Sequence, residues 1–436
     1  MSTPATESAE GLVRAIGVRS LAANGINLTL GAGIFALPAV VAAQLGAAAI
    51  AAYLVCALAM CLVVLCFAEA GSRISRSGGA YAYVEAAFGP YAGFLVSVLL
   101  WFGFGVLSDA AIANVLVDSL AAVVPGLAAP LPRALFMIGL FVALAAINVL
   151  GVRQGVRFAV GVTLVKLLPL VILIVGGVFA IRPDNLAWPG LPSAESVGTA
   201  SLVLFFAFGG METSLTASGE IRDPARTVPR GILLAVGGIL FLYLGVQVVA
   251  QGVLGPALAE SGATPLAAAA DRALGEWGRV LLLAGAALSG FGNIAGDLLA
   301  MPRALFANAR DGLLPAPLAA VHPRFRTPHV AIVAYAAMGI TFSVTGAFRQ
   351  LAIYASASVL AIYLAVCLAT IVLQRRGVQL AGEPFRLPGG PVIPLLGAAI
   401  VSWLLLQGTR QEVFGLGVGF LLATAAYAFR RRRAVA

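Results

Sequence analysis

Runs of about twenty apolar residues recur along this chain from one end to the other. Folded as a helix, such a run spans the roughly 30 Å hydrocarbon core of a bilayer. The sequence is 61% hydrophobic and only 10% charged, which leaves too few polar side chains to cover a water-facing surface. We therefore predict an all-α integral membrane protein. Its twelve expected transmembrane helices are residues 15–44, 46–70, 92–120, 132–151, 158–181, 196–218, 230–252, 277–302, 329–346, 350–373, 391–408 and 412–429.

The basic residues are divided unevenly between the two predicted faces of the membrane. With an even number of spans and the N-terminus inside, twenty of the 27 basic residues fall in cytoplasmic segments and six on the opposite face. This bias predicts a protein of the cell (inner) membrane with both termini in the cytoplasm. The net charge of +9 is then a topology signal, not the mark of a nucleic-acid partner. The arginines at 430–433 are expected to meet anionic lipid headgroups.

The polar residues of the sequence form no pattern typical of an enzyme or a metal site. Both histidines lie in one predicted loop, and no span carries the continuous polar stripe that an ion channel needs. We therefore expect no cofactor and no metal. An ion channel or a transport-inactive membrane sensor is a distant alternative for the function. The four cysteines lack metal-ligand spacing and are predicted to be core residues: Cys56, Cys61, Cys66 and Cys367.

Two of the apolar spans contain a pair of glycines near their middle. Gly31 and Gly33 interrupt the first span, and Gly209 and Gly210 interrupt the sixth. A glycine pair in a single membrane helix more often serves close packing against a neighbour. Two such pairs five spans apart instead favour interrupted helices in corresponding positions of two halves, the second half being inverted because the interval is odd. That arrangement is typical of a transporter with its substrate site at the membrane midplane.

The two predicted breaks present opposite ends of backbone dipoles to the same region. The outer half of the first span is expected to begin near Ile34–Phe35, so that the free N–H groups of residues 31–34 hold a carboxylate. The first half of the sixth span is expected to end near Phe208, so that the carbonyls of residues 206–209 accept hydrogen bonds from an ammonium. Together the breaks predict a receptor for the zwitterion of an α-amino acid.

With these features in place, the chain resembles the amino acid–polyamine–organocation (APC) superfamily of permeases. The resemblance implies secondary transport by alternating access, with two inverted five-helix repeats, helices 1–5 and 6–10, followed by helices 11 and 12. It predicts one domain with a cytoplasmic tail (1–13), a first repeat (14–181), a second repeat (195–374) and the last two helices (391–430). The matching stretches are GAGIFALP (31–38), GGAYAYVEAAFGPYAGF (78–94), FFAFGGMETSLTASGEIRDPARTVPRGI (205–232) and RALFANARDGLLPAPLAAVHPRFRTPHVAI (303–332).

The resemblance also implies which residues form the substrate site. Ala32 stands where many members carry Ser or Thr, so a hydroxyl contact to the substrate is absent. Glu212 matches a position that some members use in proton-linked gating; stabilisation of the following half-helix is the alternative role. The mostly apolar lining favours neutral L-amino acids of small or medium size. The residues expected to bind substrate are Leu28, Gly31, Ala32, Gly33, Ile34, Ser108, Phe206, Ala207, Phe208, Gly209 and Asn293.

Two acidic residues, Asp109 and Asp297, lie deep in predicted spans. Such residues seldom face lipid, and each is a functional candidate. The alternative is a structural pairing with a polar neighbour. If Asp109 faces the substrate, it could recognise a cationic side chain. A transporter or exchanger of basic amino acids or polyamines is therefore the alternative function.

Lys166 is the one lysine in the sequence and lies within the apolar run 161–177. It is about 13 Å from the predicted start of its helix, too deep to reach water by snorkelling. One interpretation ties it to backbone carbonyls left unpaired by Pro169. The resemblance suggests another, because in several members a helix-5 lysine fills the space where sodium-coupled relatives bind Na⁺. Its expected partners are then the carbonyls of residues 25–28 and Ser289, transport is sodium-independent, and the proton is the coupling ion.

Overall fold

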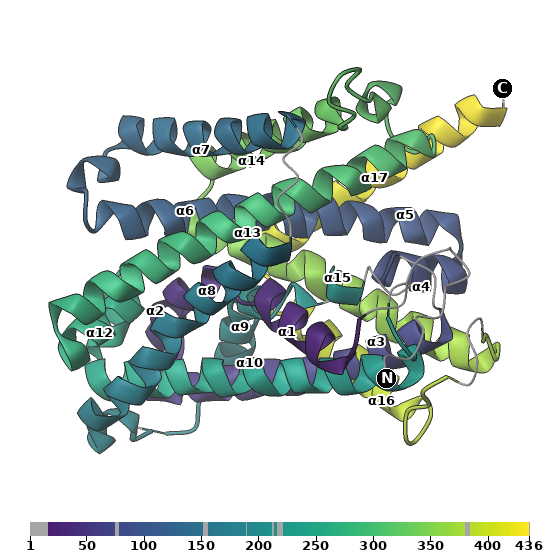
Figure 1. The fold of residues 1–436 in the computed structure, drawn as a ribbon. Helices are drawn as coiled ribbons and strands as arrows, with labels where there is room; N and C mark the ends of the chain where they lie inside the picture. The colour runs from purple at the N-terminus through teal and green to yellow at the C-terminus, as the bar shows by residue number, and fades with distance from the viewer. Residues whose placement is uncertain are drawn as a thin grey trace, which may run out of the picture.

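A bundle of helices makes up the protein in the computed structural model (Figure 1). In the part of the chain that the structure describes, seven helices are long and apolar enough to cross a membrane, and four shorter apolar helices have 10–17 residues. The β pairing in this part is an isolated bridge between Ile16 and Ile221. The predicted all-α class is therefore confirmed. The described residues are 16–74, 78–150, 156–188, 190–211, 213–215, 221–379 and 384–435.

Each of the predicted spans overlaps a helix or a group of consecutive helices. The first six correspond to α1 (Val18–Thr29) with α2 (Gly33–Leu45), α3 (Ile50–Arg73), α5 (Pro90–Val98) with a π-helical stretch (Leu99–Val106) and α6 (Leu107–Ala121), α7 (Pro130–Leu150), α8 (Val156–Gly177) and α9 (Ala194–Leu204). The last six correspond to α10 (Pro224–Leu254), α13 (Glu276–Arg310), α14 (His329–Thr345), α15 (Phe348–Arg375), α16 (Val392–Leu405) and α17 (Arg410–Val435). Shorter helices between them are α4 (Ala80–Phe88), α11 (Ala257–Glu260) and α12 (Pro265–Leu274).

The first and sixth spans are both interrupted, as the glycine pairs predict. In the first span α1 ends at Thr29 and α2 begins at Gly33, one residue before the expected start. In the sixth span α9 ends at Leu204, four residues before the expected end at Phe208, and a 3₁₀ turn over Phe205–Ala207 follows. The earlier end has a local cause, because the chain tightens to i→i+3 hydrogen bonding at the terminus of the helix.

The interrupted helices lie at the centre of the bundle. α10 packs against α1 and α3, while α13 packs against α6 and α8. In the view of Figure 1, α1, α2 and α9 are drawn between α10 and α13, with α7 and α14 side by side at one edge. Buried apolar side chains from all of these helices form one continuous core around the breaks. The repeat boundaries at 14–181 and 195–374 stay a prediction.

Candidate functional site

The backbones of the two helix breaks touch each other. Gly210 has φ +114°, a conformation that L side chains rarely adopt. A Cβ atom on this residue would lie 2.5 Å from the carbonyl oxygen of Leu28. The glycine is therefore needed for two reasons, its backbone conformation and the close approach of the first break to the second. The glycine pairs in the sequence predict two breaks, but only the fold shows that Gly210 of the second break approaches Leu28 at the first.

An aromatic ring from the second break covers the start of α2. A Cβ atom on Gly33 would lie 2.7 Å from Cδ1 of Phe206. The Phe206 ring is 6% exposed and makes an edge-to-face contact with Phe348, with ring centroids 6.0 Å apart. The ring thus packs on the helix N-terminus, where the first break is predicted to hold a substrate carboxylate.

The hydrogen bonds of the first break differ in one respect from the expectation. The N–H group of Gly31 donates to the carbonyl of Thr29 at 2.8 Å, so it is engaged within the turn. The N–H group of Phe35 donates to the carbonyl of Ala32 at 3.0 Å. The first N–H groups of an α-helix have no carbonyl acceptor within that helix, so residues 32–34 offer the donors at the start of α2. The donor set is therefore one residue shorter than the predicted 31–34.

A tyrosine that the sequence analysis did not select connects the two breaks. The hydroxyl of Tyr243, on α10, lies 2.7 Å from the carbonyl oxygen of Ala207 and 3.2 Å from that of Thr29. Tyr243 is fully buried, and its ring packs edge-to-face on Phe208. One of the carbonyls expected to bind the substrate ammonium therefore already accepts a hydrogen bond. A buried tyrosine needs a partner for its hydroxyl, and a tyrosine within the apolar span 230–252 was the available signal.

Lys166 is buried, with 4% of its surface exposed, and binds a residue of α13. Its Nζ atom donates to Oδ1 of Asn293 at 3.3 Å. A Cβ atom on Gly31 would lie 3.3 Å from Nδ2 of the same asparagine. The hydroxyl of Ser289, one turn earlier on α13, donates to the carbonyl of Leu30 at 3.4 Å. The structure therefore pairs the lysine with Asn293 in place of the predicted carbonyls and Ser289, because Asn293 lies between α8 and the first break.

The first break, Lys166 and Asn293 converge at one place in the bundle. Residues 16–421 match the family described as amino acid permease. The chain belongs to the amino acid permease family. This membership confirms the resemblance to the APC superfamily, and with the apolar helices it makes the protein a multi-pass membrane transporter.

Three relatives illustrate the range of the permease family. An uncharacterized transporter of Mycobacterium tuberculosis is 32% identical over 430 residues, covering 96% of this chain and 92% of the relative. The methylthioribose transporter of Bacillus subtilis is 29% identical over 420 residues, covering 92% of this chain and 90% of the relative. The branched-chain amino acid permease BcaP of Bacillus subtilis is 28% identical over 421 residues, with coverage of 92% and 90%.

The two intramembrane acids of the permease belong to a polar group beside Lys166. The hydroxyl of Tyr335, on α14, donates to Oδ2 of the fully buried Asp109 at 2.9 Å. The carboxyl group of Asp297 interacts electrostatically with Asp109 and also with Lys166. Asp109 is therefore engaged by α13 and α14, which fits the structural alternative for this residue.

The remaining predicted substrate residues lie around the breaks and are mostly buried. A Cβ atom on Gly209 would lie 2.7 Å from the ring of Phe104, on the π-helical stretch before α6. Leu28 is half-buried. Glu212 lies outside the described residues. Four further side chains are almost completely enclosed: Ala32, Ile34, Ser108 and Phe208.

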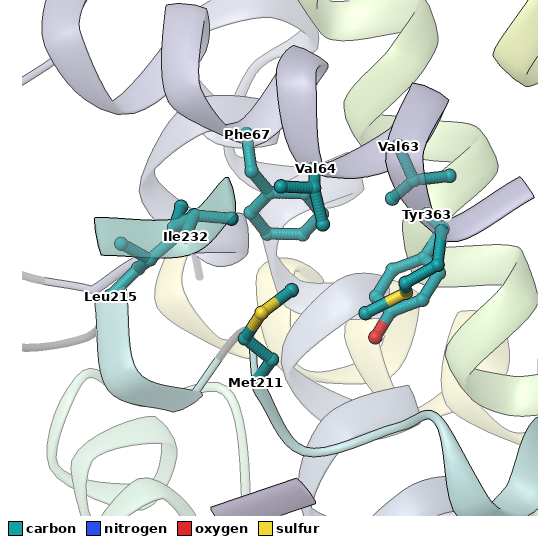
Figure 2. Close-up of a pocket in the computed structure, with 8 residues that line it drawn as sticks. Val63, Val64, Phe67, Met211, Leu215, Ile232 and Tyr363 are labelled. Atoms are coloured by element: carbon teal, nitrogen blue, oxygen red, sulfur yellow. The ribbon is translucent and has the colours of Figure 1, made fainter. Parts of the chain in front are cut away.

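Two pockets each include a residue next to one of the breaks, Met211 in the first and Phe35 in the second. Figure 2 shows the first, which Met211 borders directly after the second break. Its lining is Met60, Val63, Val64, Phe67, Met211, Leu215, Ile232 and Tyr363. The second pocket is lined by Phe35, Ser119, Ala263, Thr264, Leu266, Ala267, Leu282, Leu283 and Ala286. The described side chains at the breaks, among them Ile34, Phe206 and Phe208, are buried.

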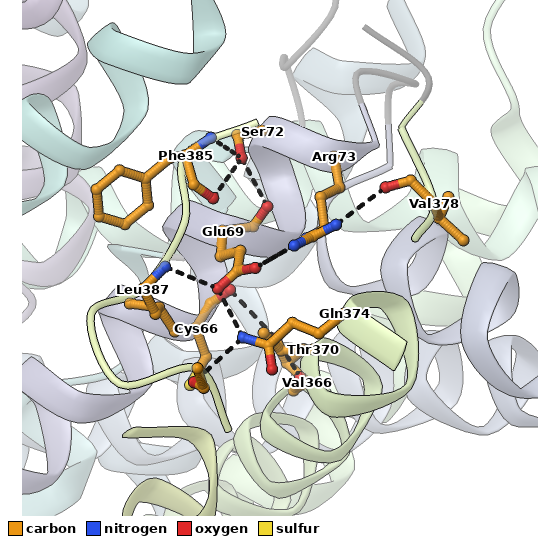
Figure 3. A network of polar contacts seen from close by, with 11 residues as sticks. Cys66, Glu69, Ser72, Arg73, Val366, Thr370, Gln374, Val378, Phe385 and Leu387 are labelled. Carbon is orange, nitrogen blue, oxygen red and sulfur yellow. Dashed lines mark hydrogen bonds and ion pairs between the residues drawn. The ribbon is translucent and has the colours of Figure 1, made fainter. Parts of the chain in front are cut away.

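A buried ion pair ties α3 to distant segments of the chain (Figure 3). Oε1 of Glu69 accepts from Nε of Arg73 at 2.9 Å, and its Oε2 accepts from Gln374 at 2.8 Å and from the backbone N–H of Leu387 at 3.1 Å. Arg73 also donates to the carbonyl of Val378 at 3.2 Å. Three partners outside the pair, Gln374, Leu387 and Val378, thus help to compensate the burial of its two charges. The cluster fixes the end of α3 to the end of α15 and to the segment before α16.

Proposed function

We propose that this permease carries neutral L-amino acids across the cell membrane by alternating access, with protons as the coupling ion and without sodium. The observation that carries the proposal is the hydrogen bond between buried Lys166 and Asn293, which lies against Gly31 in the first break. An ammonium at this place puts a positive charge beside the substrate region, and it is a group that can lose and regain a proton during the transport cycle.

The chemistry of the breaks supports an amino acid as substrate. The N–H groups of residues 32–34 and the positive end of α2 suit a carboxylate. Backbone carbonyls of the second break suit an ammonium, with the Ala207 carbonyl shared with Tyr243. Phe206 and Phe208 supply an apolar surface beside them.

The surroundings favour a neutral side chain over a basic one. The pocket next to Met211 is lined by apolar and aromatic residues. Asp109, the acid that a cationic side chain would need, already accepts from Tyr335. The relative BcaP is named as a branched-chain amino acid permease, which agrees with a neutral substrate. Transport or exchange of basic amino acids or polyamines is the alternative, and the same experiment tests it.

The proposal includes an orientation in the membrane. The excess of arginine on one predicted face supports placing both termini in the cytoplasm, with the arginines at 430–433 near anionic headgroups. It also includes two inverted repeats, because the interrupted helices meet at the bundle centre. Labelling of single cysteines introduced into predicted loops from either side of sealed cells tests the orientation. Labelling of a residue near the N-terminus from outside contradicts it.

Uptake into liposomes that contain the purified permease tests the function. We expect leucine, alanine or phenylalanine to accumulate under an inward proton gradient, with no effect of a sodium gradient. The panel includes arginine, putrescine and methylthioribose, the last because a relative is named for it. Transport of arginine or putrescine without any neutral amino acid contradicts the substrate class. Uptake that a sodium gradient multiplies contradicts the coupling.

Replacement of the lysine tests the coupling separately. Lys166→Ala is expected to abolish accumulation driven by the proton gradient, while exchange of internal for external substrate continues. Exchange needs the substrate site but no net proton movement. If the variant accumulates substrate as the unmodified permease does, Lys166 has a structural role and does not carry the coupled proton.

A further inference from the structure

Asn293 lies between the buried lysine and the break in the first span. It belongs to α13, Lys166 belongs to α8, and Gly31 lies between α1 and α2. Its amide oxygen accepts a hydrogen bond from Nζ of Lys166 at 3.3 Å. A Cβ atom added to Gly31 would lie 3.3 Å from its amide nitrogen. One short side chain therefore contacts the candidate proton carrier and lies against the break, next to the candidate carboxylate donors of residues 32–34.

The ammonium determines which way this amide faces. A lysine ammonium has three donors and no acceptor, whereas an asparagine amide has an acceptor oxygen at one end and a donor nitrogen at the other. The oxygen must therefore face Lys166, and the nitrogen is left on the side of Gly31. Because Gly31 has no side chain, the donor can approach the backbone of the break, where residues 32–34 present their N–H groups.

We propose that Asn293 couples the proton on Lys166 to the binding of the substrate carboxylate. This inference rests on the proposed function. With the proton in place, the amide is held by its oxygen, and its nitrogen donates a hydrogen bond to the carboxylate. The side chain of Ala32 has no donor to offer there, so the asparagine is the side-chain donor in that position.

Loss of the proton removes this restraint. A neutral amine carries a lone pair and can accept a hydrogen bond, so the amide can rotate and donate its N–H to the lysine instead of the substrate. The carboxylate then loses one donor. Since coupling between two ligands is reciprocal, bound substrate and bound proton strengthen each other. Two further ionisable groups of the described residues lie beside this region: Asp297, which interacts electrostatically with Lys166, and Asp109, which interacts with Asp297.

Ser289 has a different role from Asn293, although both lie on the same face of α13. Its hydroxyl donates to the carbonyl of Leu30, so it fastens the end of α1 and presents no donor to a carboxylate. The two residues are four positions apart and thus neighbours on the helix surface. The fixed contact of Ser289 with Leu30 thus lies next to the proposed reversible contact of Asn293 with Lys166.

The variant Asn293→Asp separates the two ends of the amide. The carboxylate keeps an acceptor for Lys166 but has no N–H to offer the substrate. We expect the affinity for L-leucine, measured by counterflow in liposomes, to fall by about 10- to 100-fold, the effect of a lost hydrogen bond to a charged group. We also expect the affinity of the unmodified permease to weaken as pH rises, and that of the variant to change little with pH.

Asn308→Asp is the matched control, because this buried asparagine lies on the same helix and donates to Ser97 at 2.8 Å, away from the breaks. It should leave the leucine affinity and its pH dependence unchanged. Asn293→Asp with unaltered affinity and pH dependence overturns the inference. If the unmodified permease carries no neutral amino acid, the proposed function itself fails, so the two failures are distinguishable.

A second variant covers the case in which Asn293→Asp does not fold. In Lys166→Met the amide is no longer held, so the leucine affinity should equal that of the unmodified permease at high pH and should not vary with pH. Combining both substitutions should cost no more affinity than the weaker-binding single variant, because the two residues act as one unit. Losses that simply add overturn the coupling.

Discussion

The hydroxyl of Tyr243 lies 2.7 Å from the carbonyl oxygen of Ala207 and also reaches the carbonyl of Thr29. One side chain from α10 thus holds the loose backbone of both interrupted helices. Unpaired carbonyls in a low-dielectric interior are costly, and here the protein supplies a partner itself. The breaks are therefore stabilised when no substrate is bound, and α1, α9 and α10 are linked at one point.

Removal of this hydroxyl should weaken the centre of the bundle. In Tyr243→Phe the buried carbonyl of Ala207 loses its partner, which should cost about 1–3 kcal/mol of stability. A lower thermal midpoint of the purified permease in detergent is the expected result. Tyr427→Phe serves as control because the Tyr427 ring packs near the bundle surface on Phe94 and Tyr91. Equal midpoints for the two variants contradict the role of Tyr243.

Gly210 should tolerate no side chain. In Gly210→Ala the new Cβ meets the Leu28 carbonyl oxygen at 2.5 Å, and the positive φ alone costs about 1–3 kcal/mol. We expect little monodisperse protein and no counterflow. Gly237→Ala, at a glycine on α10 with nothing within 4 Å of the added atom, should behave like the unmodified chain. A stable, active Gly210→Ala protein shows that the breaks do not touch as described.

The Glu69 cluster should contribute strongly to stability. Glu69→Ala leaves Arg73 buried without its carboxylate, which is expected to cost about 3–5 kcal/mol. The pair Arg279–Glu276 provides the contrast, since its side chains are 36% and 84% exposed and its atoms are 3.8 Å apart. Glu276→Ala should barely change the thermal midpoint, because exposed pairs contribute little. Similar midpoints for both variants contradict this assignment.

Asp109 should not select the substrate. Asp109→Asn keeps an acceptor oxygen for Tyr335 and removes the ionisable group beside Asp297. We expect the ratio of leucine to arginine uptake in liposomes to stay the same as in the unmodified permease. Asp118→Asn on the same helix is the control, because Asp118 pairs with Arg133 away from the breaks. A ratio that changes only in Asp109→Asn assigns this acid to the substrate site.

Part of the site could be predicted from single residues. Gly210 has a positive φ that glycine adopts readily, and a Cβ atom on Gly33 or Gly209 would lie 2.7 Å from an aromatic ring. The predicted positions of the helix ends were less accurate. The α9 helix ends four residues before the predicted end at Phe208, because a 3₁₀ turn follows Leu204. Tyr243 was missed because a tyrosine in an apolar span has no periodic or spacing signal that names its partner.

The sequence by itself determined that the chain lies in lipid, where its helices run and which of them are interrupted. These properties follow from the length of apolar runs, the placement of arginines and the glycine pairs, all of which are local. Only the tertiary structure decided that Lys166 binds Asn293, 127 positions away, and that Tyr243 joins the two breaks. Such contacts depend on the rotation and crossing of helices, which the packing of the whole bundle sets.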